Sequence, residues 1–260
     1  MVLDSAVGWV TLFVINLDAD HERISTLRCA LEVKQGFDIV RVSGVPGKEL
    51  PFTAREALSF DKAWAVRRGE IGCFLSHVKA WECVASTESP FSVVLEDDCV
   101  PENLERLNSL AIPSDADLIF INDRMSPGSR FGQGERVPKC LPISCALQVL
   151  NRGGLKQGGV GGDGYILTPK AARKLLDAVT ADHFFGHVDW RLLRYGVSES
   201  DLTPEFDDTE LEFVIRRHHN PNRPPAMGIL KSYCLDTPLV SSGRFSSTRE
   251  RQNENMTNLP

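Results

Sequence analysis

The chain lacks a long hydrophobic run, a surplus of basic residues and closely paired cysteines, and each absence excludes a class of protein. Its 260 residues include 29 Lys and Arg against 35 Asp and Glu, a net charge of −6, so the overall charge does not attract nucleic acid or an anionic membrane. The first apolar stretch, residues 7–17, is interrupted by Thr11 and Asn16 and is too short to span a bilayer. We therefore expect no nucleic-acid partner and at most peripheral membrane contact.

The seven cysteines are scattered along the sequence, and no two of them form a C-x-x-C pair. This spacing argues against a zinc site or a thioredoxin-like motif, and scattered thiols fit a reducing compartment. The residues before the first apolar stretch include Asp4 and no Lys or Arg, which does not match the basic start of a secretory signal. These features predict a cytoplasmic protein, which would work at the inner face of the cytoplasmic membrane if it acts on lipid-linked material.

What the chain does have is an ordinary globular composition, with 42% hydrophobic and 25% charged residues. Strands alternate with helices in the first 120 residues, which predicts an α/β fold with a Rossmann-type, mostly parallel sheet flanked by helices. We expect a single domain over residues 8–240 and a polar, flexible tail over 241–260. The predicted strands are 9–15, 39–42, 91–95, 118–121, 146–150 and 165–168; the main predicted helices are 69–84, 169–179 and 188–195, and 123–145 is predicted to be a loop.

Polar residues follow two of these buried strands directly, at Asn16–Asp18 and at Glu96–Asp98. In parallel sheets, ligands bind at the carboxyl ends of the strands. Three adjacent carboxylates repel one another, and Mg²⁺ or Mn²⁺ carrying a diphosphate would offset that repulsion. The alternative is a solvated acidic turn before a helix that begins at Pro101.

The predicted helix over residues 69–84 carries Glu70 and His77 on nearly the same face, away from its apolar stripe. A His beside a Glu can carry a proton, bind a metal or donate an oriented hydrogen bond; the alternative is a solvated helix face. Gly72 costs ~1 kcal/mol in a helix interior, and a close backbone approach by a ligand would explain it.

Residues 159–164 match the bare pattern G-x-G-x-x-G. We reject a dinucleotide site, because that motif should open a helix directly, whereas a strand follows here. A loop over a bound substrate and a plain surface loop both remain open. Asp163 and Asp189 are lone carboxylates that can take a proton from an attacking hydroxyl, although Asp189 also suits the first turn of a helix as a dipole partner.

Four stretches together resemble glycosyltransferase family 25, the bacterial lipooligosaccharide galactosyltransferases related to collagen galactosyltransferases. They are FVINLDADHER (13–23), GEIGCFLSH (69–77) with Trp81, VVLEDD (93–98) and GYILTPKAARKLL (164–176). The second string and its spacing of about twenty residues to LEDD carry most of the resemblance, which covers roughly residues 10–195.

The resemblance implies a GT-A-like fold and an inverting transfer of a hexose, with galactose expected, from a UDP-sugar to a hydroxyl of a glycan or glycolipid such as lipooligosaccharide. It places the donor nucleotide at Asn16, Leu17 and Arg23, and it places Mn²⁺ or Mg²⁺ on Glu96 and Asp98. The remaining residues assigned to the site are Asp97 and Ser76 in donor binding and Glu70 and His77 beside the reacting groups.

In the mechanism that follows, the metal stabilises charge on the leaving diphosphate, and a carboxylate deprotonates the acceptor hydroxyl. We expect Asp189 to be this base, with Asp163 as its competitor. Two alternatives stay open: a catalytically inactive GT-A-like binding module, which UDP and metal would not stabilise, and a metal-dependent phosphohydrolase, which would cleave simple phosphate esters without a sugar acceptor.

Overall fold

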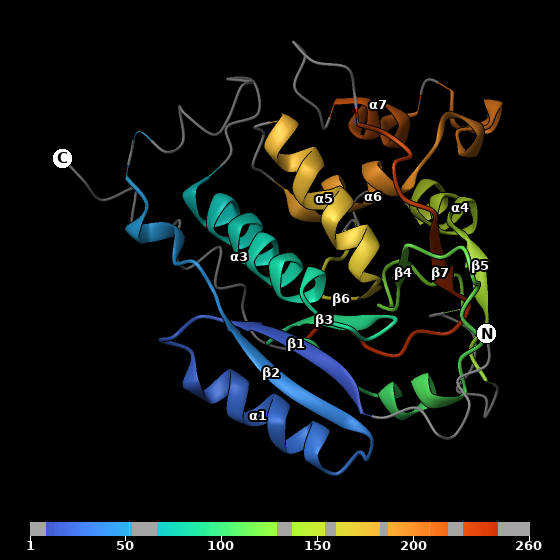
Figure 1. Ribbon diagram of the computed structural model, residues 1–260. Helices are drawn as coiled ribbons and strands as arrows, with labels where there is room; N and C mark the ends of the chain where they lie inside the picture. The colour runs from blue at the N-terminus through green and yellow to red at the C-terminus, as the bar shows by residue number, and fades with distance from the viewer. Residues whose placement is uncertain are drawn as a thin grey trace.

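The computed structural model describes residues 9–51, 53, 67–128, 137–153, 160–182, 187–207, 209–217 and 226–243. In these ranges the chain builds one seven-stranded sheet in the order β2-β1-β3-β6-β4-β7-β5, with helices on both faces (Figure 1). The strands are β1 (Val10–Asn16), β2 (Phe37–Ser43), β3 (Ser92–Glu96), β4 (Leu118–Phe120), β5 (Cys140–Pro142), β6 (Gly164–Leu167) and β7 (Ser232–Leu235). The α-helices are α1 (His21–Glu32), α3 (Arg68–Ala85), α4 (Ile143–Gly153), α5 (Pro169–Asp182), α6 (Val188–Gly196) and α7 (Glu210–Arg217).

Five of the seven strands run in one direction. β1 pairs in parallel with β2 and β3, and β4 pairs in parallel with β7, whereas β6 lies antiparallel between β3 and β4, and β5 lies antiparallel at the edge. The prediction of an α/β fold with a mostly parallel sheet is confirmed. Because β6 runs backwards, its first residues lie at the same edge of the sheet as the last residues of β1 and β3.

The sheet has a hydrophobic core on each face, and β1 shows how the sequence builds both. Phe13 and Ile15 pack in one core, beneath α3 and α5, and Leu12 and Val14 pack in the other, against α1. Successive residues of a strand point to opposite faces, so a continuous apolar run fits a strand that is covered on both sides. Figure 1 shows α3 and α5 on one face and α1 on the other.

The predicted helices over 69–84, 169–179 and 188–195 are confirmed as α3, α5 and α6. The predicted strand at residues 146–150 is wrong: these residues belong to α4, which also begins inside the predicted loop over 123–145. Ile143, Ala146, Leu147 and Leu150 are all buried, and their spacing of three, four and seven residues is that of one helix face. A short apolar run alone does not distinguish a strand from a buried helix.

The residues after the glycine pattern lead into β6, and α5 begins only at Pro169. This order supports the rejection of a dinucleotide site, since no helix follows the glycines directly. Near the other end of the chain, Ser241 pairs with Val100 through backbone hydrogen bonds of 2.9 and 3.0 Å. Of the predicted flexible tail, residues 244–260 lie outside the described residues.

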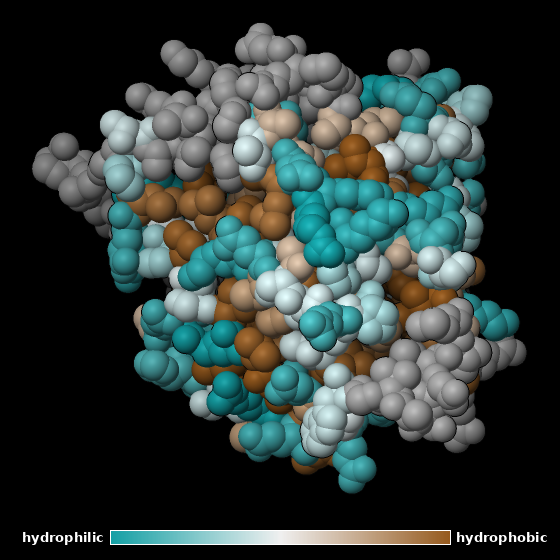
Figure 2. Space-filling view, in the orientation of Figure 1, coloured by the Kyte–Doolittle hydropathy of each residue, from teal (hydrophilic) through white to brown (hydrophobic). Residues whose placement is uncertain are grey.

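Among the helices in the described ranges, none combines the length and the apolar character that crossing a membrane requires. On the face shown in Figure 2, hydrophilic and hydrophobic residues are interspersed across the coloured part of the surface.

Candidate functional site

A cavity lies at the sheet edge where β1 and β3 end, and it encloses about 580 Å³, part of it open to solvent. Parallel strands that end side by side leave such a crevice between their following loops. Eight of the eleven residues expected at the site line it: Asn16, Leu17, Arg23, Ser76, His77, Glu96, Asp97 and Asp98. The structure thus brings together residues from β1, α1, α3 and β3 that lie up to 82 positions apart. Glu70, Asp163 and Asp189 are not among the residues that line the cavity.

Asn16, Arg23 and Asp97 form a buried clamp between the ends of β1 and β3. Asn16 Nδ2 donates to Asp97 Oδ2 at 2.6 Å, and Arg23 donates to Asp97 Oδ1 at 3.1 Å. Burial raises the pKa of Asp97, and these two bonds oppose that rise. Both carboxylate oxygens of Asp97 therefore accept bonds from protein donors, and the residue fixes the wall of the cavity.

Glu96 and Asp98 flank this clamp. Arg23 lies 3.7 Å from Asp98, which is beyond hydrogen-bond distance. Burial, followed by the charge of Glu96, raises the pKa of Asp98 to about 7, although Arg23 opposes the rise. The charged form of Asp98 is therefore disfavoured mainly by the loss of solvent and also by repulsion from Glu96. Carboxylate oxygens are the ligands that Mg²⁺ and Mn²⁺ prefer, so Glu96 and Asp98 fit a divalent cation.

Helix α3 forms the opposite wall through Ser76 and His77. Ser76 Oγ accepts from the backbone N–H of Val45 at 2.8 Å and donates to Gly72 O at 2.7 Å. A Cβ at Gly72 would lie 2.5 Å from Val45 O. The expectation that a ligand explains Gly72 is therefore corrected: the chain's own loop after β2 approaches the helix at this position.

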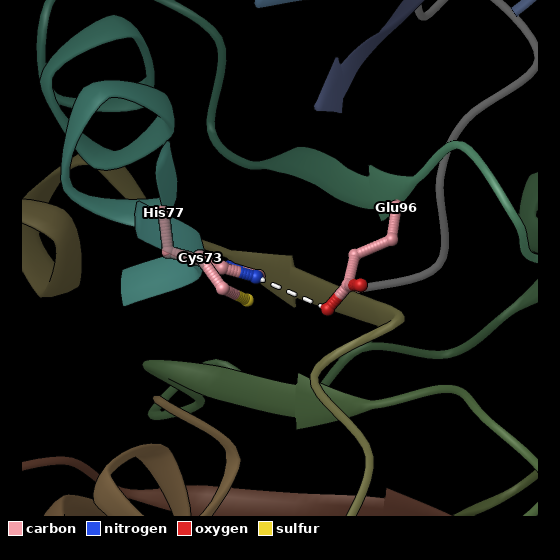
Figure 3. A group of neighbouring side chains, drawn as sticks. All are labelled: Cys73, His77 and Glu96. Carbon is pink, nitrogen blue, oxygen red and sulfur yellow. Dashed lines mark hydrogen bonds and ion pairs between the residues drawn. The ribbon is translucent and has the colours of Figure 1, made fainter. Parts of the chain in front are cut away.

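Cys73, His77 and Glu96 also line the cavity, and Figure 3 shows their side chains pointing toward one another. Their ligand atoms all lie within 4.8 Å of one another, and His77 Nε2 lies 3.3 Å from Glu96 Oε1. Sulfur, imidazole nitrogen and carboxylate oxygen are ligands for Zn²⁺. Among the described residues this is the group whose ligand atoms the structure brings together, whereas Glu96 and Asp98 are a candidate pair by their chemistry and their shared cavity.

Asp163 lies next to the cavity, because its backbone carbonyl accepts from Glu96 N–H at 3.1 Å just before β6 begins. Its carboxylate makes an ion pair of 3.0 Å with Arg124 and accepts from Ser242 Oγ at 3.2 Å. Burial raises the pKa of Asp163, and Arg124 opposes that rise. Both carboxylate oxygens thus face protein donors.

Sequence reasoning missed Arg124 and Ser242, together with Asn122, whose Nδ2 donates to Gly161 O at 2.7 Å. A signal for two of them was present. Asn122 and Arg124 follow the strand at 118–121, and the rule that selected Asn16 and Glu96, polar residues at the carboxyl end of a buried strand, selects them too. Ser242 follows no such strand, and only the folded chain brings it here.

Asp189 lies in the first turn of α6 and faces the glycine segment. A Cβ at Gly162 would lie 2.5 Å from Asp189 Oδ1 and 3.6 Å from His77 Cε1, so the Asp189 carboxylate and the imidazole approach the same point. Glu70 lies at the start of α3, where it accepts from Arg67 N–H at 2.7 Å and reaches His187 at 3.7 Å. That bond makes Glu70 part of a capping box.

The chain has relatives among known proteins. Over residues 10–185 it matches the family model described as Glycosyltransferase family 25 (LPS biosynthesis protein). It is 33% identical over 101 residues to procollagen galactosyltransferase 2 of Homo sapiens, which is 35% of this chain and 16% of that protein. It is 26% identical over 176 residues to a glycosyltransferase 25 family member of Drosophila pseudoobscura pseudoobscura, which is 64% of this chain and 27% of that protein.

The chain thus spans well under a third of the length of these curated relatives. Among solved structures, it is similar to the apo-form glycosyltransferase GlyE of Streptococcus pneumoniae TIGR4, with a TM-score of 0.39 and 12% identity, covering 95% of this chain and 60% of that one. The matched family region includes both walls of the cavity, from Asn16 in β1 to Asp98 after β3. Because this match covers more than half of the chain, the chain belongs to glycosyltransferase family 25.

Proposed function

We propose that this chain is a metal-assisted, inverting glycosyltransferase that moves a hexose, with galactose as the first candidate, from a UDP-sugar to a hydroxyl of a glycan acceptor. One observation carries the proposal: Glu96 and Asp98 line the same cavity as Asn16 and His77. The human relative is a procollagen galactosyltransferase, which supports galactose as the sugar, and the family description, LPS biosynthesis protein, supports a lipopolysaccharide-type acceptor.

In this proposal Glu96 and Asp98 hold Mn²⁺ or Mg²⁺, which when bound neutralises negative charge on the donor diphosphate. The protein contributes the rigid frame. The clamp of Asn16, Arg23 and Asp97 fixes the end of β3 and the turn after it, which carry the two ligands, and α3 closes the opposite side. Such preorganised charge stabilises a leaving group without reorganising during the reaction.

We assign the base to Asp189. Inversion requires the acceptor hydroxyl to attack the anomeric carbon from the face opposite the diphosphate, and a carboxylate must take its proton. Asp163 suits this role less well, because Arg124 and Ser242 engage both of its oxygens. Asp189 Oδ1 instead packs against Gly162, close to His77, which lines the cavity.

The test is UDP release from UDP-galactose and other UDP-sugars, with a panel of glycan acceptors and Mn²⁺, and with mass spectrometry of the product. We expect acceptor-dependent sugar transfer that falls at least about 100-fold in Asp98→Asn, a loss typical of removing an electrostatic contact to the transition state. Transfer by Asp98→Asn at the wild-type rate would contradict the proposal.

The same assay separates the two alternatives. A phosphohydrolase would release phosphate from p-nitrophenyl phosphate without a sugar acceptor, and an inactive binding module would produce neither product. We expect no phosphate release, because the family to which the chain belongs is one of glycosyltransferases.

A further inference from the structure

A chain of hydrogen bonds runs through the core of the protein and ends at Glu96. Trp81 Nε1 lies 2.8 Å from the Tyr165 hydroxyl, the same hydroxyl lies 2.9 Å from His77 Nδ1, and His77 Nε2 lies 3.3 Å from Glu96 Oε1. Trp81, Tyr165 and His77 are each 0% exposed. These hydrogen bonds therefore link α3 and β6 to the end of β3, and Glu96 is the first residue of the series that solvent reaches.

Trp81, the first residue of the series, sets the donor-to-acceptor direction of the hydrogen bonds. An indole N–H only donates, so the Tyr165 oxygen accepts from Trp81. The Tyr165 hydroxyl proton then requires an acceptor, because a buried donor without an acceptor destabilises the fold. Within the described residues, that acceptor is His77 Nδ1.

A neutral imidazole that accepts at Nδ1 carries its proton on Nε2. His77 Nε2–H consequently donates to Glu96 Oε1. The His77 and Tyr165 rings stack at 5.8 Å with an interplanar angle of 21°, which holds the imidazole plane in place. Every bond in the chain thus points toward the Glu96 carboxylate.

We propose that His77 is a positioning residue, which Trp81 and Tyr165 lock in the Nε2–H form so that it fixes the Glu96 carboxylate for cation binding. This inference rests on the proposed function, in which Glu96 is a cation ligand. His77 engages Oε1, and the proposal assigns Oε2 to the cation. A donor that orients a metal-binding carboxylate affects metal affinity by about 10–100-fold in other proteins.

The same series of hydrogen bonds disfavours a metal that is bound by Cys73, His77 and Glu96 together. Ligation through His77 Nε2 would require the proton on Nδ1. Tyr165 would then face two donors, Trp81 Nε1–H and His77 Nδ1–H, and its hydroxyl proton would lose its acceptor among the described residues. The inference therefore predicts that Cys73 contributes nothing to cation affinity.

Two variants of His77 test the inference directly. The amide of Gln places an N–H close to the position of Nε2, whereas the amide of Asn reaches only the position of Nδ1. We expect His77→Gln to keep Mn²⁺ affinity in the presence of UDP within about threefold of wild type, and His77→Asn to weaken it about 10–100-fold. Mn²⁺ binding is measured by electron paramagnetic resonance of the free ion, and kcat and KM for the donor are measured in parallel.

Controls separate this role from general stability. Tyr165→Phe should weaken Mn²⁺ binding, whereas Tyr195→Phe, which removes another buried hydroxyl bonded to Arg191 at 3.0 Å, should not. Cys73→Ser should bind Mn²⁺ as wild type does. Melting temperatures of all variants show whether each one is folded.

Several outcomes would overturn the inference. They are equal losses in His77→Gln and His77→Asn, no loss in either, or a loss in Cys73→Ser as large as in His77→Asn. The histidine tautomer is read independently from ¹⁵N NMR of the metal-free protein, where His77 should show a protonated Nε2, and a protonated Nδ1 would refute the chain. If wild type binds no Mn²⁺ with UDP while the tautomer is as expected, the proposed function fails and the hydrogen-bond chain stands.

Discussion

At the scale of single residues, the site contains carboxylates with different surroundings, and those surroundings separate their roles. Asp97 and Asp163 are each paired with an arginine and accept a further hydrogen bond, which suits residues that hold the site together. Asp98 lies 3.7 Å from Arg23, beyond hydrogen-bond distance, which suits the residue that we propose as a cation ligand. The residue type alone does not make this distinction; the partners do.

The assignment of the base predicts opposite phenotypes for two Asp→Asn variants. Asp189→Asn should lower kcat about 100-fold or more, the contribution typical of a general base, while leaving UDP binding and the melting temperature close to wild type. Steady-state kinetics and UDP titration measure this. Asp177→Asn, at an exposed position of α5, is the matched control and should change neither.

Asp163→Asn should instead weaken the fold, because Arg124 would lose its charged partner. We expect a loss on the order of 2 kcal/mol in the free energy of unfolding, a value typical of hydrogen bonds to charged groups, measured by urea denaturation. A stable Asp163→Asn variant without turnover, beside an active Asp189→Asn, would reverse the two roles.

At the scale of elements, α3 organises the site through its contact with the loop after β2. Gly72→Ala would place a methyl group 2.5 Å from Val45 O, so the loop or the helix must shift. Overpacking of this kind costs about 1–3 kcal/mol, and in a chain of this size each kcal/mol lowers the melting temperature by roughly 2–4 °C.

Because Val45 and Ser76 line the cavity, the same variant should also raise KM for the donor. Differential scanning calorimetry and donor kinetics measure the two effects. Glu82→Ala, an exposed position of α3, serves as the control. A Gly72→Ala variant with unchanged stability and KM would show that the contact with the loop does not shape the site.

The elements also show what sequence periodicity can and cannot supply. β1, β3 and α3 were predictable, because continuous apolar runs and a clear helical stripe leave one interpretation. α4 was not, since three of its core residues form a short apolar run at 146–150 and the fourth, Ile143, falls in the predicted loop. The antiparallel direction of β6 depends on the path of the chain between elements, which no local pattern records.

The same limit applies to the site. Asn16, Glu96 and Asp98 could be predicted, because polar residues that end buried parallel strands meet at one edge. Glu70 shared a helix face with His77 in the sequence pattern, yet the structure places it at the capped start of α3. The contact between His77 and Tyr165 joins positions 88 apart and follows from tertiary packing alone.

At the scale of the whole molecule, the acidic cluster of Glu96, Asp97 and Asp98 should make the free energy of unfolding depend on pH. The pKa of Asp98 is about 7 in the folded chain, against an ordinary value of 3.8, so between those values the folded state binds more protons than the unfolded state. The free energy of unfolding of the metal-free protein should then fall as the pH rises from 5 to 7, and the contribution of Asp98 should level off above pH 7.

Urea denaturation at pH 5, 6, 7 and 8 in the presence of a chelator measures this dependence. Asp98→Asn should flatten the profile, because the amide does not titrate. Stability that rises over this range by the same amount in wild type and in Asp98→Asn would contradict the account of the cluster.

The most direct test of the central claim is calorimetric titration of UDP into wild type and Asp98→Asn, with Mn²⁺ and with a chelator. Wild type should bind UDP with Mn²⁺ and at least about tenfold more weakly without it, a difference of about 1.4 kcal/mol in binding free energy. Asp98→Asn should bind weakly in both conditions. UDP binding of equal strength with and without Mn²⁺ in wild type would show that the carboxylates after β3 do not hold the donor through a cation.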